Sequence, residues 1–241
     1  MAKLFLCLCF LLLGAAVAHA SDTVFLEELT WTELRDQIRA GKTTVIVPIG
    51  GTEQNGSHMA LGNALVAPVI AYVPEGALAP PTGHMRFPGT ITVPEDAFDK
   101  ILEYAARSFK LAGFHDIVFL GDHGSYQKDE KAVADRLNKE WAAQPVRVHG
   151  VEEYYRASES EFGRLLTSKG YRQEEVGTHA GLADTSLTLA VDPHLVRTDR
   201  LQSGDGANGD PGRSSAELGQ LGVDLIVTRT VDAIRKATSH P

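Results

Sequence analysis

The stretch IVFLGDHGS, residues 117–125, contains the pattern that decides the fold of this 241-residue chain. Its apolar first half predicts a short buried strand, and glycines beside an aspartate and a histidine follow directly. Residues 44–58, TVIVPIGGTEQNGSH, have the same order, with a β-branched apolar run before glycines and ionisable groups. Helical patterns alternate with these runs, which predicts an α/β fold with a mainly parallel sheet flanked by helices.

The expected elements follow from periodicity and from start and stop signals. A capping box, TWTE at 30–33, opens the first helix, and Gly113 ends the second. Helices are expected over residues 30–40, 94–112, 126–142, 159–169, 182–191 and 214–237, the last with a break at Gly222. Strands are expected over 44–49, 65–73, 117–120 and 146–151, and specificity loops over 74–92 and 152–160.

The N-terminus has the pattern of a secretory signal peptide. Lys3 precedes an apolar run over 4–13, and an Ala-His-Ala cleavage signal ends at Ala20. The run is too short for a membrane span. We therefore expect residues 1–20 to be removed, residues 21–241 to form a single domain, and the protein to be secreted or periplasmic. Both cysteines lie in the removed segment, so the mature chain has no disulfide and no thiol nucleophile.

Composition narrows the function. Hydrophobic residues make up 43% of the chain and the formal net charge is −8. These values are ordinary for a folded protein and argue against a nucleic-acid surface, which needs a basic face.

Three polar segments are candidates for chemistry. In parallel sheets, ligands bind beyond the carboxyl ends of the strands. Glu53 and His58 follow one expected strand, and Asp122 and His123 follow another. A third segment, THAGLADTS at 178–186, supplies a histidine and a carboxylate at the start of a helix. Oxygen and nitrogen ligands from three loops would suit one zinc, manganese or iron ion that holds a water.

These segments resemble the creatininase (creatinine amidohydrolase) family. EQNGSHMALG at 53–62 is similar to its signature E-Q-H-G-P-H-L-P-L-G-T-D, and RFPGT at 86–90 matches its F-P-G-T loop. GDHGS at 121–125 stands where the family has N-G-H-G-G-N, and 179–186 matches H-A-G-x-x-E-T-S. GDP at 209–211 and AELG at 216–219 match C-terminal elements, so the resemblance runs from about residue 45 to 234.

The resemblance implies a three-layer, single-domain amidohydrolase that cleaves linear or cyclic amides, uses one or two divalent metals and is often a hexamer. Carried over by position, Glu53 and His123 match metal ligands. His179 matches a histidine near the scissile amide, which we expect to protonate the leaving nitrogen. Asp184 matches a carboxylate that binds or faces the second metal.

Two departures from the family pattern matter. Asn55 and Ala64 replace the histidine and the aspartate that bridge two metals in the family, so one ion is expected. Only residues 51–64 separate two expected strands, whereas a parallel crossover needs about a dozen residues or more, usually with a helix. Either these strands are not parallel neighbours, or a helix after Gly62 is absent from this chain.

Other interpretations of these residues stay open. His58, His84 and Asp122 are expected to line the pocket, whereas Asp122 and Ser125 could instead cap a helix. Asp184 could likewise only cap the helix that it opens. The hydrolase hypothesis therefore has an alternative, an impaired or inactive family member that binds a small ligand.

Overall fold

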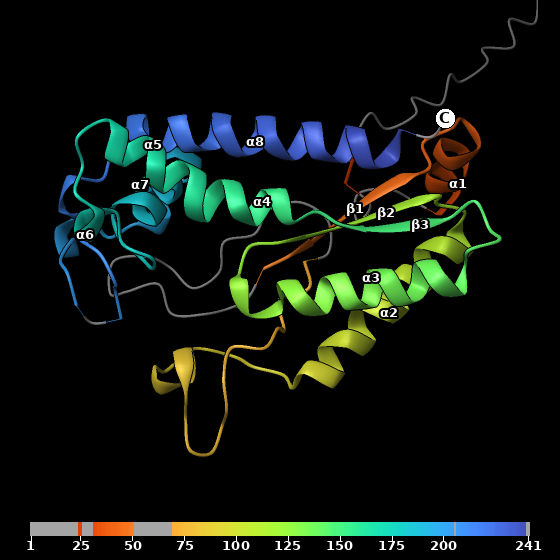
Figure 1. The fold of residues 1–241 in the computed structure, drawn as a ribbon, viewed down its shortest axis with the longest axis horizontal. Coiled ribbons are helices and arrows are strands. Elements are labelled where there is room, and N and C mark those ends of the chain that lie inside the picture. Colours follow the sequence, from red (N-terminus) through yellow and green to blue (C-terminus); the bar gives the residue numbers. More distant parts are fainter. Residues whose placement is uncertain (1–23, 26–30, 51–68, 205, 240–241) are drawn as a thin grey trace, which may run out of the picture.

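The computed structural model describes residues 24–25, 31–50, 69–204 and 206–239 (Figure 1). Three strands form its sheet, in the order β1 (Thr44–Ile49), β2 (Asp116–Gly121) and β3 (Arg147–Gly150). Both strand pairs are parallel, with Val47 opposite Phe119 and Phe119 opposite Gly150. The expected parallel sheet is thus confirmed, and all three carboxyl ends lie at one edge.

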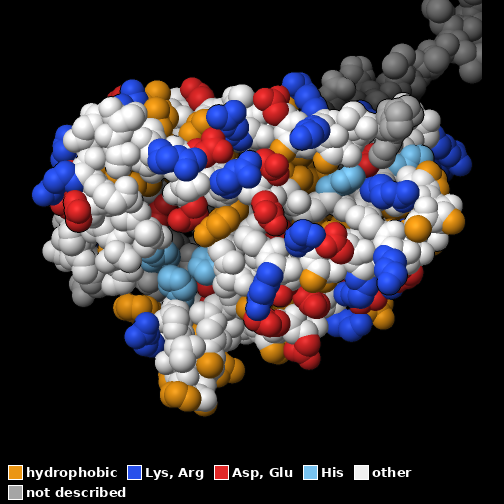
Figure 2. Space-filling view, viewed as in Figure 1, with side chains coloured by type: hydrophobic (Ala, Val, Ile, Leu, Met, Phe, Trp, Pro, Cys, Tyr) orange, Lys and Arg blue, Asp and Glu red, His pale blue; other side chains and the backbone are white. Residues whose placement is uncertain are grey.

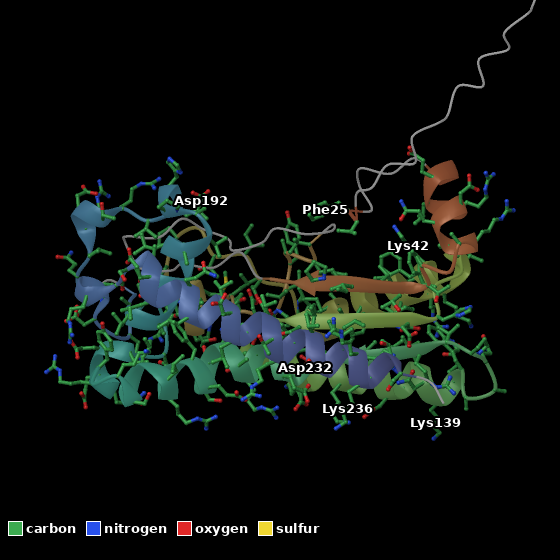
Figure 3. The ribbon with its side chains drawn as sticks, turned by 90° about the horizontal axis from the view of Figure 1, so that it is seen from above. Phe25, Lys42, Lys139, Asp192, Asp232 and Lys236 are labelled. Atoms are coloured by element: carbon green, nitrogen blue, oxygen red, sulfur yellow. The ribbon has the colours of Figure 1, made fainter. Side chains whose placement is uncertain are left out.

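Helices cover both faces of this sheet. They are α1 (Trp31–Arg39), α2 (Glu95–Ala112), α3 (Gln127–Glu140), α4 (Glu152–Arg156), α5 (Phe162–Ser168), α6 (Gln173–Val176), α7 (Leu182–Val191) and α8 (Ala216–Thr238). In Figure 1, α2 and α3 lie on one side of the sheet and α4 and α8 on the other. Figure 3 shows α8 extending from the region of α7 to the sheet. In the described ranges, no helix combines the length and the apolar character needed to cross a membrane.

Two apolar clusters hold these layers together. The larger one joins the sheet to α2 and α3 through fully buried side chains such as Phe119, Leu102 and Leu137. The second joins α5 to α7, with Phe162 and Leu182 fully buried and Leu225 of α8 packed against them. Because each fully buried large side chain contributes about 1.5–3 kcal/mol, the second cluster holds α7 and α8 against α5.

One glycine ends helix α2, whereas another lies inside the continuous helix α8. Gly113 ends α2 in a left-handed conformation, with φ 104°, as expected. The expected break of the last helix at Gly222 is wrong, because α8 is continuous through it. A Cβ atom at this position would lie 2.7 Å from Leu187 Cδ2 and 2.8 Å from Phe162 Cζ. Gly222 therefore permits close packing instead of interrupting the helix.

The segment expected to be a loop over 152–160 is helical. It forms α4 and then a π-helical turn, Ala157–Glu161, that continues into α5. The sequence has few large apolar residues here, so no strong helical period is visible. Ala157 is fully buried in the structure, and this tertiary packing supports a helix that the sequence pattern does not indicate.

The strand expected over 65–73 is described from residue 69 onward and makes a single parallel bridge, between Ile70 and Ile49. Gly50 N–H donates to the Ile70 carbonyl, and Ile70 N–H donates to the Pro48 carbonyl, both at 3.3 Å. The two segments are therefore parallel neighbours at this point. The predicted signal peptide over 1–20 and the departures at Asn55 and Ala64 lie outside the described residues.

Candidate functional site

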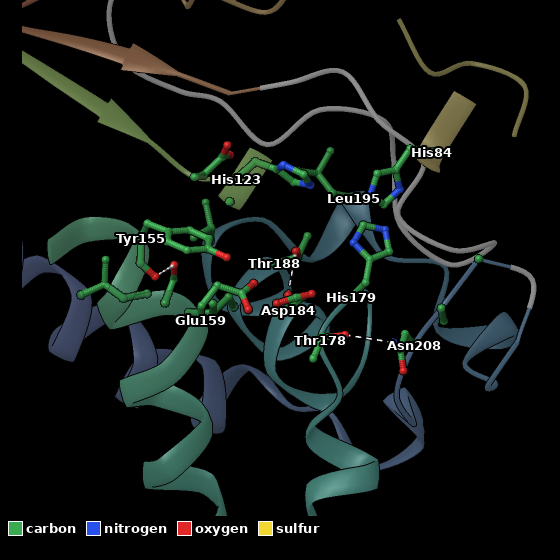
Figure 4. A pocket seen from close by; sticks show the side chains of 18 of the residues that line it. His84, His123, Tyr155, Glu159, Thr178, His179, Asp184, Thr188, Leu195 and Asn208 are labelled. Atoms are coloured by element: carbon green, nitrogen blue, oxygen red, sulfur yellow. Dashed lines mark hydrogen bonds between the residues drawn. The ribbon is translucent and has the colours of Figure 1, made fainter. Parts of the chain in front are cut away.

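A cavity of about 1270 Å³ lies beyond the carboxyl ends of the strands. Five side chains chosen from the sequence line it: His84, Asp122, His123, His179 and Asp184. Histidines gather at this hollow in Figure 2, and Figure 4 shows His84 and His179 pointing toward each other. The volume is sufficient for a small organic substrate. Glu53 and His58, the other predicted site residues, lie outside the described residues.

Two histidines that line this cavity, His84 and His123, and the neighbouring Glu75 have the spacing of metal ligands. One ligand atom from each of Glu75, His84 and His123 lies within 4.8 Å of the others. His123 Nε2 is 3.9 Å from Glu75 Oε2. The Glu75 side chain is fully buried and that of His123 is 27% exposed. A carboxylate and two imidazoles form a donor set that suits zinc and related ions and leaves a coordination position open.

Local structure fixes His123 and Glu75 relative to each other. His123 follows β2 and caps the turn Gly124–Tyr126, with Nδ1 accepting the Ser125 N–H at 3.2 Å. Ser125 Oγ lies 2.8 Å from the same Nδ1 and donates to the carbonyl of Pro74 at 2.9 Å. The predicted helix cap at Ser125 is therefore wrong, since His123 is the cap and Ser125 connects it to the segment that carries Glu75.

Asp122 lines the cavity, as predicted, but is not a helix cap. Its carboxylate accepts a hydrogen bond from Tyr126 Oη at 2.5 Å. Burial raises the pKa of Asp122 to about 6, and the negative charge of Asp184 adds to the rise. This carboxyl group therefore ionises less readily than an ordinary aspartate.

Burial keeps the two ligand histidines neutral. Burial, followed by the neighbouring His179 and His123, lowers the pKa of His84 to about 4. Burial and His179 also lower the pKa of His123. Neutral imidazoles are the form that binds a metal, so the surroundings favour ligation at neutral pH.

His179 is held beside the triad by a tight loop. Its ring centroid lies 4.5 Å from that of His84. Its backbone pairs with Asn208, whose N–H donates to the His179 carbonyl at 2.7 Å. The next residue, Ala180, has φ 54°, a left-handed conformation that alanine rarely adopts. Such strain is often found where a functional side chain is positioned.

Asp184 stabilises that loop from the first turn of α7. Its Oδ2 accepts the Ala180 N–H at 2.7 Å. Burial raises the pKa of Asp184, while this hydrogen bond and His179 oppose the rise. Asp184, predicted as a metal ligand, is not part of the group of ligand spacing found among the described residues. It is not a helix cap either, because the N-cap residue of α7 is Gly181 and no side chain caps it. Asp184 instead binds the Ala180 N–H and lines the cavity.

Glu75 is the site residue that sequence reasoning missed. It follows the apolar run 69–73 and precedes Gly76, the same arrangement that identified the other strand ends. The signal is thus present in the sequence, although residues 74–92 as a whole are expected only to form a specificity loop. His84 was expected to line the pocket and also lies at ligand distance.

Known proteins resemble this chain over most of its length. A family model described as creatinine amidohydrolase matches residues 27–234. Creatinine amidohydrolase of Pseudomonas putida is 25% identical over 260 aligned residues, covering 90% of this chain and 98% of that protein. The mycofactocin precursor peptide peptidase of Mycobacterium ulcerans (strain Agy99) is 27% identical, covering 73% of this chain and 69% of its own.

Solved structures share the fold. A crystal structure of creatinine amidohydrolase (creatininase) superposes with a TM-score of 0.76 at 22% identity, covering 92% of this chain and 100% of that one. Two further creatininase structures, one described with manganese and one as a Zn-Zn type, give TM-scores of 0.73 and 0.71 at 23% identity. They cover 90% and 91% of this chain, respectively, and 100% of their own.

Proposed function

Because the chain belongs to the creatininase family, we propose that it is a metal-dependent amidohydrolase that cleaves a C–N bond of a small linear or cyclic amide. The observation that carries this proposal is the meeting of Glu75, His84 and His123 at ligand spacing. The two histidines share a cavity with His179, whose ring lies beside that of His84. The similarity to a creatinine amidohydrolase and to a peptide peptidase supports the proposal that the bond cleaved is a C–N bond.

The proposed cofactor is one divalent ion of zinc, manganese or iron. Glu75, His84 and His123 would hold it, since one carboxylate and two neutral imidazoles fit such an ion. The manganese and zinc in the creatininase structures support this choice. When bound, the ion would polarise the amide carbonyl and lower the pKa of a bound water toward neutrality.

Other side chains of the cavity would orient the substrate and move protons. His179 would protonate the leaving nitrogen, because imidazole is the commonest proton-transfer group near neutral pH and this ring lies beside the triad. Asp184 would keep His179 in place through its hydrogen bond to Ala180. The products would be a carboxylic acid and an amine, with one water consumed.

The alternative of an inactive, ligand-binding family member rested on Asn55 and Ala64. No observation on the described residues favours it, and the cavity contains both ligand types and a proton-transfer group. The hydrolase is therefore the better-supported function.

Metal analysis of His123→Ala tests the proposal. The wild-type chain should bind about one equivalent of zinc, manganese or iron, and the variant should lose this metal because one of three ligands is removed. The fold should survive, since His123 follows the strand instead of packing within it. Metal content, thermal melting with added metal and hydrolysis of a panel of small amides are the measurements.

Asp122→Asn is the matched control, because it changes the neighbouring side chain without removing a ligand. It should retain the metal. Full metal content in His123→Ala would disprove the ligand assignment, and a metal-loaded wild type without amide hydrolysis would disprove the reaction.

We also propose that the protein is exported and that it assembles into a homo-oligomer, a hexamer by resemblance to the family. The N-terminal pattern supports export. Light scattering on the purified chain measures the assembly, and a monomeric mass would contradict it.

A further inference from the structure

Glu159 lies on the cavity wall formed by the helix that follows β3. The side chains of Tyr155, Ser158 and Glu159 all line the cavity. Tyr155 and Glu159 are four residues apart, a spacing that places both on one helix face. Glu159 belongs to the π-helical turn Ala157–Glu161, and such turns are frequent at functional sites. Figure 4 shows its carboxylate directed toward Asp184.

Two neighbouring acidic residues of this helix, Glu153 and Glu161, are paired with arginines, whereas Glu159 is not. Glu161 pairs with Arg229 at 2.8 Å and with Arg156 at 3.6 Å. Glu153 lies 3.9 Å from Arg156. Glu159 makes no hydrogen bond or ion pair with any residue that the structure describes. Its side chain is exposed at the cavity and has no partner on the described part of the chain.

The surroundings of Glu159 disfavour an uncompensated negative charge. Although Glu159 is exposed at the cavity, the surrounding protein and the charge of Asp184 together raise its pKa to about 7. Burial, followed by the negative charge of Glu159, raises the pKa of Tyr155. A positive group placed here would favour the ionised carboxylate and gain a charge-assisted hydrogen bond.

The tyrosine provides a second feature suited to a cation. The half-buried ring of Tyr155 stands beside Glu159 in the cavity (Figure 4). Gly124 leaves room for it, since a Cβ there would lie 2.6 Å from the Tyr155 hydroxyl. An aromatic face next to a carboxylate attracts ammonium and guanidinium groups.

The spacing favours an organic cation over a second metal. Among the described residues, the group of ligand atoms close enough for a metal ion is Glu75, His84 and His123, and Glu159 is not part of it. Apolar side chains of α7 and α8, including Leu187, Val223 and Val227, line the same cavity. They could contact the aliphatic part of a cationic molecule.

We propose that Glu159, beside Tyr155, binds an ammonium or guanidinium group of the substrate and thereby selects amides that carry a positive charge. This inference rests on the proposed hydrolase function and names the substrate class of that cavity. Glu159 is a specificity residue, whereas the reaction itself takes place at the triad and His179. The formal net charge of −8 would also attract such substrates.

A pair of probes of the same shape tests the proposal. Butylguanidinium carries a positive charge and N-butylurea is its neutral counterpart. Dissociation constants of both for the full metal-loaded protein are measured by ligand-observed NMR. The wild type should bind the cation about ten-fold more tightly than the urea, the range of one charge-assisted hydrogen bond.

Three variants separate charge recognition from general damage. Glu159→Gln should lose this preference and bind both probes alike, whereas Glu159→Asp should retain part of it. Glu161→Gln is the matched control, because it removes one carboxylate from the same turn outside the cavity. It should keep the wild-type preference. Circular dichroism verifies that every variant is folded.

A wild type without preference for butylguanidinium, or a folded Glu159→Gln that keeps the preference, would overturn the inference. Probe binding needs no turnover, so this outcome is distinct from a failure of the proposed reaction. That failure would appear as absence of metal-dependent hydrolysis in the wild type, whatever the result at Glu159.

Discussion

Ser125 links the two segments that carry the candidate metal ligands. A histidine that offers Nε2 to a metal must carry its proton on Nδ1. When Nδ1 of His123 carries the proton, it donates to Ser125 Oγ at 2.8 Å in place of accepting the Ser125 N–H. The Ser125 hydroxyl in turn donates to the Pro74 carbonyl at 2.9 Å. Pro74 precedes Glu75, so the serine orients one ligand and connects it to the segment of another.

Ser125→Ala should therefore weaken metal binding without removing a ligand. Partners that orient a ligand histidine typically contribute 10–100-fold to metal affinity, so we expect a loss of about that size. Zinc affinity, measured by competition with a chelating dye, gives the result. Ser158→Ala is the control, because it removes another cavity-lining hydroxyl, one that donates to the Tyr155 carbonyl. Equal affinity in Ser125→Ala and wild type would show that the serine does not orient His123.

At the scale of elements, the packing of α7 against α8 fixes the wall of the cavity that carries Asp184. The helices approach closely at Gly219, where a Cβ atom would lie only 1.8 Å from the backbone oxygen of Ser186. Backbone cannot rotate away as a side chain can. The close approach of α7 therefore requires a glycine at position 219, although glycine lowers the helix propensity of α8.

Gly219→Ala should destabilise the protein even though alanine favours helices by about 1 kcal/mol. Overpacking typically costs about 1–3 kcal/mol, and here the contact is with backbone, so we expect a net loss in the free energy of unfolding. Urea denaturation gives the value. The exposed neighbour Gln220→Ala should be almost neutral. A Gly219→Ala protein as stable as wild type would show that the helices separate easily.

The short helix α6 stabilises the loop of His179 through Glu175. The backbone N–H and the guanidinium of Arg172, followed by Arg213, lower the pKa of Glu175 to about 2. The Glu175 carbonyl accepts the Asp210 N–H at 3.0 Å, next to the segment that pairs with His179. The backbone of Glu175 thus binds the segment that pairs with His179, and its carboxylate connects α6 to Arg213.

The lowered pKa of Glu175 determines the sign of a pH effect. An ordinary glutamate ionises near pH 4.5, so the folded state favours the charged form. The resulting stability is present above about pH 4.5 and is lost as the pH falls toward 2. Glu175→Gln should therefore lower the melting temperature at pH 7, with a difference from wild type that shrinks in acid. The exposed Glu174→Gln should show no such trend, and a pH-independent difference for Glu175→Gln would contradict the ion-pair explanation.

At the scale of the whole molecule, the N-terminal pattern predicts a processed, exported protein. Lys3, the apolar run over 4–13 and the Ala-His-Ala signal place the mature N-terminus near Ser21. N-terminal sequencing of protein from the cell envelope or the medium should find this residue first. An intact Met1 in a cytosolic fraction would contradict the prediction.

The sequence determined the class of fold and the edge of the sheet at which the cavity lies. Residues 44–49 and 182–191 formed the expected strand and helix, because their apolar patterns and turn signals are local. Parallel strands place their carboxyl ends at one edge, so the sequence alone was sufficient to assign Asp122 and His123 to the cavity. His179 could be assigned through its family motif.

Only the tertiary structure decided which side chains meet there. The distance between Glu75, His84 and His123 depends on the path of a long loop, which periodicity does not encode. The helical state of residues 152–161 likewise depends on burial against other elements more than on local propensity. Glu75 and Glu159 are therefore identified only from the structure. The chemical role of a carboxylate depends on which side chains lie near it in the fold, and the distance along the sequence does not show this.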